Sequence, residues 1–189
     1  AEENRIPVPI SQVPQNLQNA FVAAEDVRFY EHHGVDPRGI LRAVFANLTS
    51  GNATGQGGST ITQQLARNAF LTQEQTLKRK LLEVVLAFEI ESKYTKKQIL
   101  EMYMNQIYFG QGCYGIQTAA HVYFGKDVKD LSLSQCAMLA GLPNSPNYYS
   151  PFRSLEAAKY RQGIVLDQMA KYGYISAADA QAAKAADVH

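Results

Sequence analysis

Apolar residues recur every three or four positions along most of this chain, which is the spacing of one face of a helix. Neither an internal repeat nor a sustained strand alternation accompanies this pattern. The longest segment, residues 76–92, places Leu77, Leu81 and Phe88 on one stripe together with two valines. The periodicity predicts helices over residues 16–31, 38–49, 60–70 and 76–92.

Hydroxyl residues mark three further helix starts. Thr95 with Gln98, Ser132 with Gln135, and Ser176 with Asp179 have the spacing of capping boxes, in which two side chains satisfy orphan backbone donors. The tail from Leu155 onward is interpreted as two short helices joined at Gly173. Glycine-rich or proline-rich loops are expected over residues 50–58, 110–115 and 143–151. The pattern as a whole predicts a mostly α single domain over residues 1–189.

Composition narrows the class of protein. The chain has 189 residues, of which 46% are hydrophobic and 19% are charged, as in one ordered globular domain. Its net charge of +1 gives no support to nucleic-acid binding. No apolar run approaches the roughly 18 residues of a membrane-spanning helix. Because the chain starts with neither Met nor a signal peptide, we interpret it as a soluble fragment of a longer protein, without that protein's anchor.

Two cysteines, Cys113 and Cys136, are too few for a disulfide scaffold, and their spacing fits no metal motif. A single bridge is one interpretation. Two buried free thiols are the other, and we favour it slightly.

Residues 55–68, GQGGSTITQQLARN, do not have the composition of a core segment. Glycines let a backbone approach a ligand closely, and Ser59 and Thr60 at a helix start offer hydroxyls and unpaired N–H groups to an anion. The amides of Gln63 and Gln64 suit sugar hydroxyls, and Arg67 lies one turn after Gln63 and can grip a phosphate. A mobile loop ending in a helix cap explains the hydroxyls but neither the amides nor the arginine, so we favour a binding site.

Three other segments carry polar groups in apolar surroundings. Glu25 follows an apolar run, where partial burial would suit a general base, but for this segment alone we favour a solvated helix end with Arg28 as its ion-pair partner. Arg79 and Lys80 precede Glu83 by one helical turn, which fits a pyrophosphate site or a surface salt-bridge ladder. Segment 99–110 adds Tyr103, Asn105 and Tyr108, which suit either a carbohydrate or buried contacts with the backbone.

Together these segments resemble the peptidoglycan glycosyltransferase family, the transglycosylase domain of class A penicillin-binding proteins and their monofunctional relatives. The resemblance covers roughly residues 5–175, and five motifs occur in the family's order. They are AAEDVRFYEHHG (23–34), GGSTITQQLARN (57–68), RKLLE (79–83), ILEMYMNQIYFGQGCYG (99–115) and AMLAGLPNSPNYYSP (137–151).

The resemblance implies a lysozyme-like, two-lobed fold with a large helical lobe and a smaller jaw lobe, roughly residues 38–58, that dips into the membrane surface. It implies that lipid II is added to a growing lipid-linked glycan chain with inversion at the anomeric carbon. Glu25 would be the general base, while Glu83 and nearby cations would assist the leaving pyrophosphate. Glu83 is also compatible with a divalent ion, Mg or Mn, which the sequence does not demand. A fused transpeptidase domain and the outer face of the bacterial cell membrane are the implied setting.

The expected substrate contacts, from the residues and from the resemblance, form one set. They are Asp26, Phe29, His32, Gly58, Ser59, Thr60, Gln63, Gln64, Arg67, Asn68, Lys78, Arg79, Lys80, Tyr103, Asn105 and Tyr108. Gln75 and Leu82 stand where many relatives carry cations, which puts the strength of phosphate binding in doubt.

Two other functions compete with this one. A lysozyme-like hydrolase or lytic transglycosylase would cut the same polymer and would also use carboxylates. It has no use, however, for the cations of segments 57–68 and 79–83. A scaffold that only binds lipid II would not need Glu25 or Glu83, and both are present.

Overall fold

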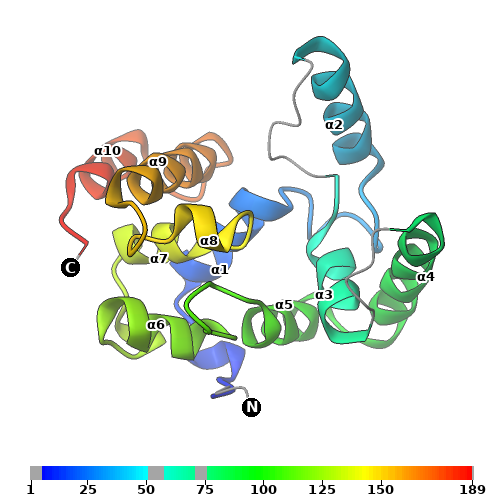
Figure 1. The fold of residues 1–189 in the computed structure, drawn as a ribbon, viewed down its shortest axis with the longest axis horizontal. Helices are drawn as coiled ribbons and strands as arrows, with labels where there is room; N and C mark the ends of the chain where they lie inside the picture. The colour runs from blue at the N-terminus through cyan, green and yellow to red at the C-terminus, as the bar shows by residue number, and fades with distance from the viewer. Residues whose placement is uncertain (1–5, 51–57, 71–75, 189) are drawn as a thin grey trace. The chain divides into compact units, whose positions relative to one another are not determined.

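The computed structural model describes residues 6–50, 58–70 and 76–188 of the chain. Within these ranges the structure is helical, with no strand and one isolated antiparallel bridge between Tyr108 and Tyr114. The prediction of a mostly α protein is therefore confirmed. The α-helices, labelled in Figure 1, are α1 (Gln15–Glu25), α2 (Pro37–Ser50), α3 (Ile61–Phe70), α4 (Leu77–Lys93), α5 (Lys96–Gln106), α6 (Ile116–Phe124), α7 (Leu133–Gly141), α8 (Pro146–Tyr149), α9 (Leu155–Lys171) and α10 (Ala177–Ala185).

The chain forms two compact units. The first unit combines Ala1–Val27 with Met104–His189, and the second unit is Arg28–Tyr103. Helices α2, α3 and α4 belong to the second unit, and α5 runs from the second unit into the first. The segment predicted as a jaw lies within the second unit, but its residues 51–57 lie outside the described ranges, so that boundary stays a prediction.

The first unit has an apolar helical core. Helix α7 packs against α1 and α9, and α10 packs against α9 (Figure 1). Leu17 and Phe21 of α1, Leu139 of α7 and Val165 of α9 are fully buried there. This arrangement removes apolar surface from water on several helices at once, which is the main source of the unit's stability.

Both cysteines are free and buried, as the favoured interpretation predicted. Burial raises the pKa of the Cys136 thiol to about 12, so it stays protonated at neutral pH and packs as a small apolar side chain.

The three predicted helix starts are found where the hydroxyl residues placed them. Ser132 and Gln135 form a complete capping box at α7. Thr95 and Gln98 form another before α5, with N···O distances of 2.9 and 3.2 Å. At α10 the Ser176 hydroxyl accepts from the Asp179 N–H, which caps the helix from one side.

Two predicted boundaries are wrong. The first helix ends at Glu25 and not at residue 31, because Asp26 leaves the helical region with φ −162° and ψ 79°. The following residues form a turn closed onto the Arg28 carbonyl, and this turn buries Asp26 and Phe29. The predicted loop 143–151 contains the short helix α8, which begins with a proline at its first turn.

Helix α4 exposes most of its large apolar side chains and buries two of its charged ones. The predicted stripe of leucines and phenylalanine lies in solvent, with Leu77 78% and Leu81 60% exposed, whereas Glu83 is 0% and Arg79 is 5% exposed. The buried face packs against α3 (Figure 1). Helix α2 also exposes large apolar side chains, including Leu41, Phe45 and Leu48. Ordinary surface helices have the opposite polarity, so both helices call for a functional explanation.

Candidate functional site

A buried carboxylate on α4 organises a cluster of polar side chains in the second unit. Arg67 of α3 binds Glu83 with both ends of its guanidinium group, each N···O distance being 3.0 Å. The Lys80 ammonium group lies 3.0 Å from Glu83 Oε1. Ser59 Oγ accepts from Arg67 at 3.1 Å and from Lys80 at 3.0 Å. Ser59, Arg67, Lys80 and Glu83 therefore lie together, and we call them the α3–α4 cluster.

The charges of this cluster do not cancel. The Glu83 side chain is fully buried, while those of Arg67 and Lys80 are 25% and 45% exposed. Two cations against one carboxylate leave an excess of one positive charge, carried by the two groups that face water. Such a site can accept an anion without moving its cations, because the carboxylate already holds them in place.

Two opposing effects act on the pKa of Glu83. Burial works to raise the pKa, since it disfavours the charged form. The hydrogen bonds and positive charges of Arg67 and Lys80 outweigh burial, so the pKa lies below its ordinary value of 4.5. Glu83 is therefore an anion at neutral pH, and its role in the cluster is electrostatic.

The start of α3 is held by its own capping box. Gln63 Oε1 accepts from the Thr60 N–H at 2.9 Å, and Thr60 Oγ1 accepts from the Gln63 N–H at 3.1 Å. The Thr60 hydroxyl also donates to the Gly34 carbonyl at 2.7 Å. Both side chains are buried, so in this structure they fix the backbone beside Ser59.

The turn before α2 packs against the same region. Gly34 has φ +129°, and a Cβ there would lie 3.2 Å from the backbone of Ala87 on α4, so only glycine fits. His32 is buried, and its Nδ1 accepts from the Gly34 N–H at 3.0 Å. Phe29 is fully buried, with its ring edge-on to His32. These motif residues shape the turn on which the start of α3 rests.

The other predicted contacts of the second unit differ in exposure. Tyr103 is buried, and its hydroxyl lies 3.3 Å from Gln64 Oε1. Asn68 and Lys78 are exposed, and Gly58 is half-buried against Ile40 of α2. Arg79 lies on the buried side of α4, one turn before Glu83. Leu82 is exposed, whereas Gln75 lies outside the described residues.

The first unit holds the remaining predicted residues. Glu25 is the last residue of α1 and is half-buried, at the edge of the core as the sequence predicted. Asp26 is buried beside it. The Asn105 amide pairs with the Val8 backbone at 2.9 and 3.0 Å, which is the buried-contact alternative raised for this segment. Tyr108 is half-buried, and its hydroxyl accepts from the Gly112 N–H at 3.2 Å.

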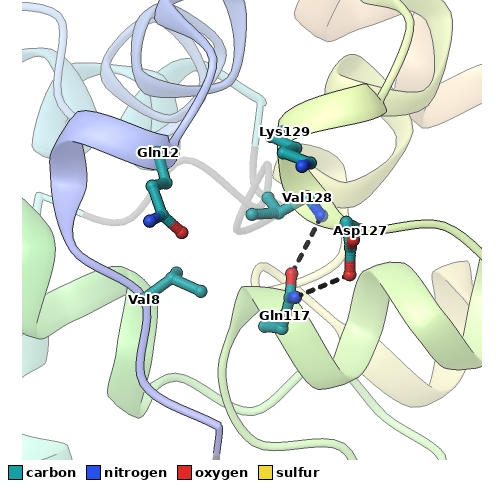
Figure 2. Close-up of a pocket in the computed structure, with 6 residues that line it drawn as sticks. All are labelled: Val8, Gln12, Gln117, Asp127, Val128 and Lys129. Atoms are coloured by element: carbon teal, nitrogen blue, oxygen red, sulfur yellow. Dashed lines mark hydrogen bonds between the residues drawn. The ribbon is translucent and has the colours of Figure 1, made fainter.

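A separate hollow of about 100 Å³ in the first unit contains none of the predicted residues. Figure 2 shows its lining of Val8, Gln12, Gln117, Asp127, Val128 and Lys129. The Gln117 amide in this lining donates to Asp127 and accepts from the Val128 N–H, at 3.0 and 2.8 Å (Figure 2).

The second unit contains two ion pairs that the sequence did not predict. Arg28 binds Asp36 at 2.8 Å, and this guanidinium holds the pKa of Asp36 below its ordinary value although burial opposes it. Lys96 binds Glu91 at 2.7 Å. Glu91 and Lys96 are five residues apart on successive helices, so helical periodicity carries no signal for their contact.

Comparisons with known proteins identify the family of this chain. The family described as Transglycosylase matches residues 1–170. This chain belongs to the transglycosylase family. Its helical fold is also similar to the 2.6 Å crystal structure of penicillin-binding protein 1A from Haemophilus influenzae, with a TM-score of 0.59 and 26% identity over 99% of this chain and 18% of that one. The match agrees with the expected mostly α, lysozyme-like fold.

Full-length relatives of this transglycosylase chain are much longer. Penicillin-binding protein 1F of Bacillus subtilis (strain 168) is 50% identical over 96% of this chain and 25% of its own length. Penicillin-binding protein 1A of Escherichia coli (strain K12) is 53% identical over 93% of this chain and 20% of its own length. The chain thus spans a quarter or less of these relatives, and the family predicted from the five motifs is confirmed.

Proposed function

We propose that this transglycosylase chain is a peptidoglycan glycosyltransferase that polymerises lipid II into β-1,4-linked glycan strands and releases undecaprenyl pyrophosphate. The observation that carries the proposal is the α3–α4 cluster, in which a fully buried Glu83 holds Arg67 and Lys80 beside Ser59. A polyprenyl pyrophosphate leaving group presents the multiple negative charge that such cations stabilise.

The cluster would act on the charge that develops as the glycosidic bond to pyrophosphate breaks. Arg67 and Lys80 are already oriented by Glu83, so little reorganisation is needed when the anion forms. The Ser59 hydroxyl, which accepts from both cations, would add a donor beside them. Arg79 and Lys78 would add longer-range positive charge from the same helix.

Glu25 would be the general base that takes the proton from the acceptor 4-hydroxyl as this oxygen attacks the anomeric carbon. Its half-buried place at the end of α1 supports the assignment, since a carboxylate at a core edge can meet a substrate and still be shielded from bulk water. Glu25→Gln should reduce polymerisation by about 10²–10⁴-fold while the fold survives. A variant with near-normal turnover would remove Glu25 from this role.

A resident divalent ion does not fit the donor groups described at Glu83. Both carboxylate oxygens already accept from Arg67 or Lys80, and the described residues contain no group of three His, Cys, Asp or Glu side chains suited to a metal. The proposed leaving-group assistance therefore rests on the two cations. Comparing turnover with and without Mg or Mn tests whether an ion is needed in addition.

The exposed apolar faces of α2 and α4 support a place at a membrane surface. No described helix is long and apolar enough to cross a bilayer. Leu41 and Phe45 on α2, and Leu81 on α4, instead present apolar surface that an interfacial helix would insert among lipid headgroups. We place this surface at the outer face of the bacterial cell membrane, where lipid II would be consumed, and expect a transpeptidase domain in the full-length protein.

Incubation of the purified chain with labelled lipid II in detergent, followed by gel separation, tests the proposal. A ladder of lipid-linked glycan strands is the expected result. Breakdown of added mature glycan without a ladder would favour the lysozyme-like hydrolase. Binding of lipid II without either reaction, by a folded protein, would favour the scaffold.

A further inference from the structure

Lys96, the first residue of α5, has a side chain that is only 20% exposed. Its ammonium group donates to Glu91 Oε1 and to the His32 carbonyl, both at 2.7 Å. It also lies 4.6 Å from the centroid of the Phe29 ring. A carboxylate, a backbone carbonyl and an aromatic face thus surround one cation, and all of them belong to the second unit.

Glu91 extends this contact to a third helix. The same oxygen that binds Lys96 accepts from the Thr62 hydroxyl of α3 at 2.9 Å. Lys96 and Glu91 therefore connect the start of α5, the end of α4, the second residue of α3 and the turn at His32. We call the Lys96–Glu91 pair, with its contacts to Thr62 and His32, the α5 brace.

The α5 brace and the capping box of α3 both bind the turn that contains His32 and Gly34. The brace binds the His32 carbonyl, and the Thr60 hydroxyl binds the Gly34 carbonyl at 2.7 Å. The turn is thereby fixed against α3 at two carbonyls two residues apart. Ser59 directly precedes Thr60, so the position of the Ser59 hydroxyl depends on how the Thr60 backbone is held.

We propose that Lys96 is a positioning residue for glycosyl transfer, acting through the α5 brace on the α3–α4 cluster. The inference rests on the proposed function. Buried ion pairs add little net stability compared with apolar replacements, because desolvation offsets their attraction. Their distinctive contribution is a fixed geometry. Here that geometry keeps Ser59 Oγ within 3.1 Å of both Arg67 and Lys80.

The experiment compares the two charges of the brace removed singly and together. Lys96→Met leaves Glu91 buried without its cation, and this variant is expected to lose stability. The double variant Lys96→Met/Glu91→Gln carries no unpaired charge, and its amide oxygen can still accept from Thr62. Lys93→Met removes the same charge from an exposed position on the last turn of α4 and serves as the control.

The double variant decides between positioning and simple stabilisation. We expect its urea midpoint to return towards that of the wild type while kcat for lipid II polymerisation stays about tenfold or more below it. We expect KM for lipid II to change little, and Lys93→Met to match the wild type throughout. Recovery of kcat together with stability would overturn the inference. Absence of polymer from the wild type would instead overturn the proposed function.

Discussion

Helices α4 and α9 are alike in length and in their starts, yet they use their faces in opposite ways. Each has 17 residues and begins after a hydroxyl residue that accepts from an N–H in the first turn. Helix α9 exposes only a few of its apolar side chains and buries Val165, Leu166 and Met169, together with Arg161, in its core. Helix α4 buries Arg79 and Glu83 as well as Ala87 and Ile90, and it exposes its leucines. A helix that serves only stability resembles α9. The inverted polarity of α4 indicates a charged site on one side and an apolar environment on the other.

The largest expected effect follows from removing the buried charge of α4. Glu83→Gln should lower turnover of lipid II by about 10²–10³-fold, because Arg67 and Lys80 lose the anion that orients them. The protein should stay folded, since both cations reach water. Single-turnover rates normalised to folded protein measure the effect. A loss of less than threefold would show that the buried charge is not catalytically important.

The matching substitution in α9 should affect stability instead. Leu166 is fully buried, so Leu166→Ala should lower the free energy of unfolding by about 2–5 kcal/mol. Turnover per folded molecule should equal that of the wild type. Urea denaturation and single-turnover assays on the same preparation provide both numbers. Reduced turnover of the folded variant would mean that α9 also contributes to the site.

The exposed apolar faces of the two helices should differ in their response to membranes. Leu81→Ser in α4 should weaken binding to lipid vesicles several-fold, because one buried leucine contributes roughly 1.5–3 kcal/mol at most. Leu155 of α9 is exposed to a similar extent as Leu81, and Leu155→Ser should leave vesicle binding unchanged. Co-sedimentation with anionic vesicles measures both. An equal loss of vesicle binding in the two variants would show that binding depends on exposed apolar surface in general and not on α4.

The loss of stability at acid pH should depend on the contacts of Glu83 with Arg67 and Lys80. Its pKa is lowered in the folded protein, so it stabilises the fold above its ordinary value of 4.5, and this stabilisation is lost as pH falls through the lowered pKa. The difference in unfolding free energy between wild type and Glu83→Gln should therefore shrink between pH 7 and pH 3. Denaturation curves at both values measure it, and a difference independent of pH would contradict the pairing.

The smallest effect is expected at the first turns of α4 and α9, where the two helices have the same kind of cap. Thr76→Ala and Ser154→Ala each remove one hydroxyl acceptor from a helix start. Each should lower the free energy of unfolding by about 1 kcal/mol. Similar values from denaturation curves would confirm that the helices differ in their faces and not in their ends. A much larger loss for Thr76→Ala would indicate a further role at the start of α4.

Local signals in the sequence predicted most of the helices. The capping boxes at Ser132 and Thr95 were found as predicted, because hydroxyl and amide residues three apart have few other uses before an apolar run. The end of α1 was not predicted. Residues after Glu25 keep a helical pattern in the sequence, but burial of Asp26 and Phe29 in a tight turn outweighs that local preference.

The site was predictable where its residues share one helix and less so elsewhere. Lys80 and Glu83 are three residues apart, so their contact follows from helical geometry. The bidentate contact of Arg67 with Glu83 joins two helices and was expected only as a shared role in phosphate binding. The Lys96–Glu91 pair depends on how α4 and α5 meet, which periodicity does not encode.

The direction of the α4 stripe was the least predictable feature. A row of leucines at helical spacing has the same pattern whether it faces a core or a membrane surface. Only the burial of Arg79 and Glu83, four residues apart on α4, identified the leucines as the exposed side.

Binding of inorganic pyrophosphate to the purified chain tests the central claim most directly, because it isolates the charged face from the rest of the reaction. Calorimetric titration should give an affinity that Lys80→Met weakens by about tenfold, the loss of one charge-assisted contact. The control Lys171→Met, at the end of α9, should bind as the wild type does. Equal affinities for wild type and Lys80→Met would contradict the assignment of the α3–α4 cluster to the leaving pyrophosphate.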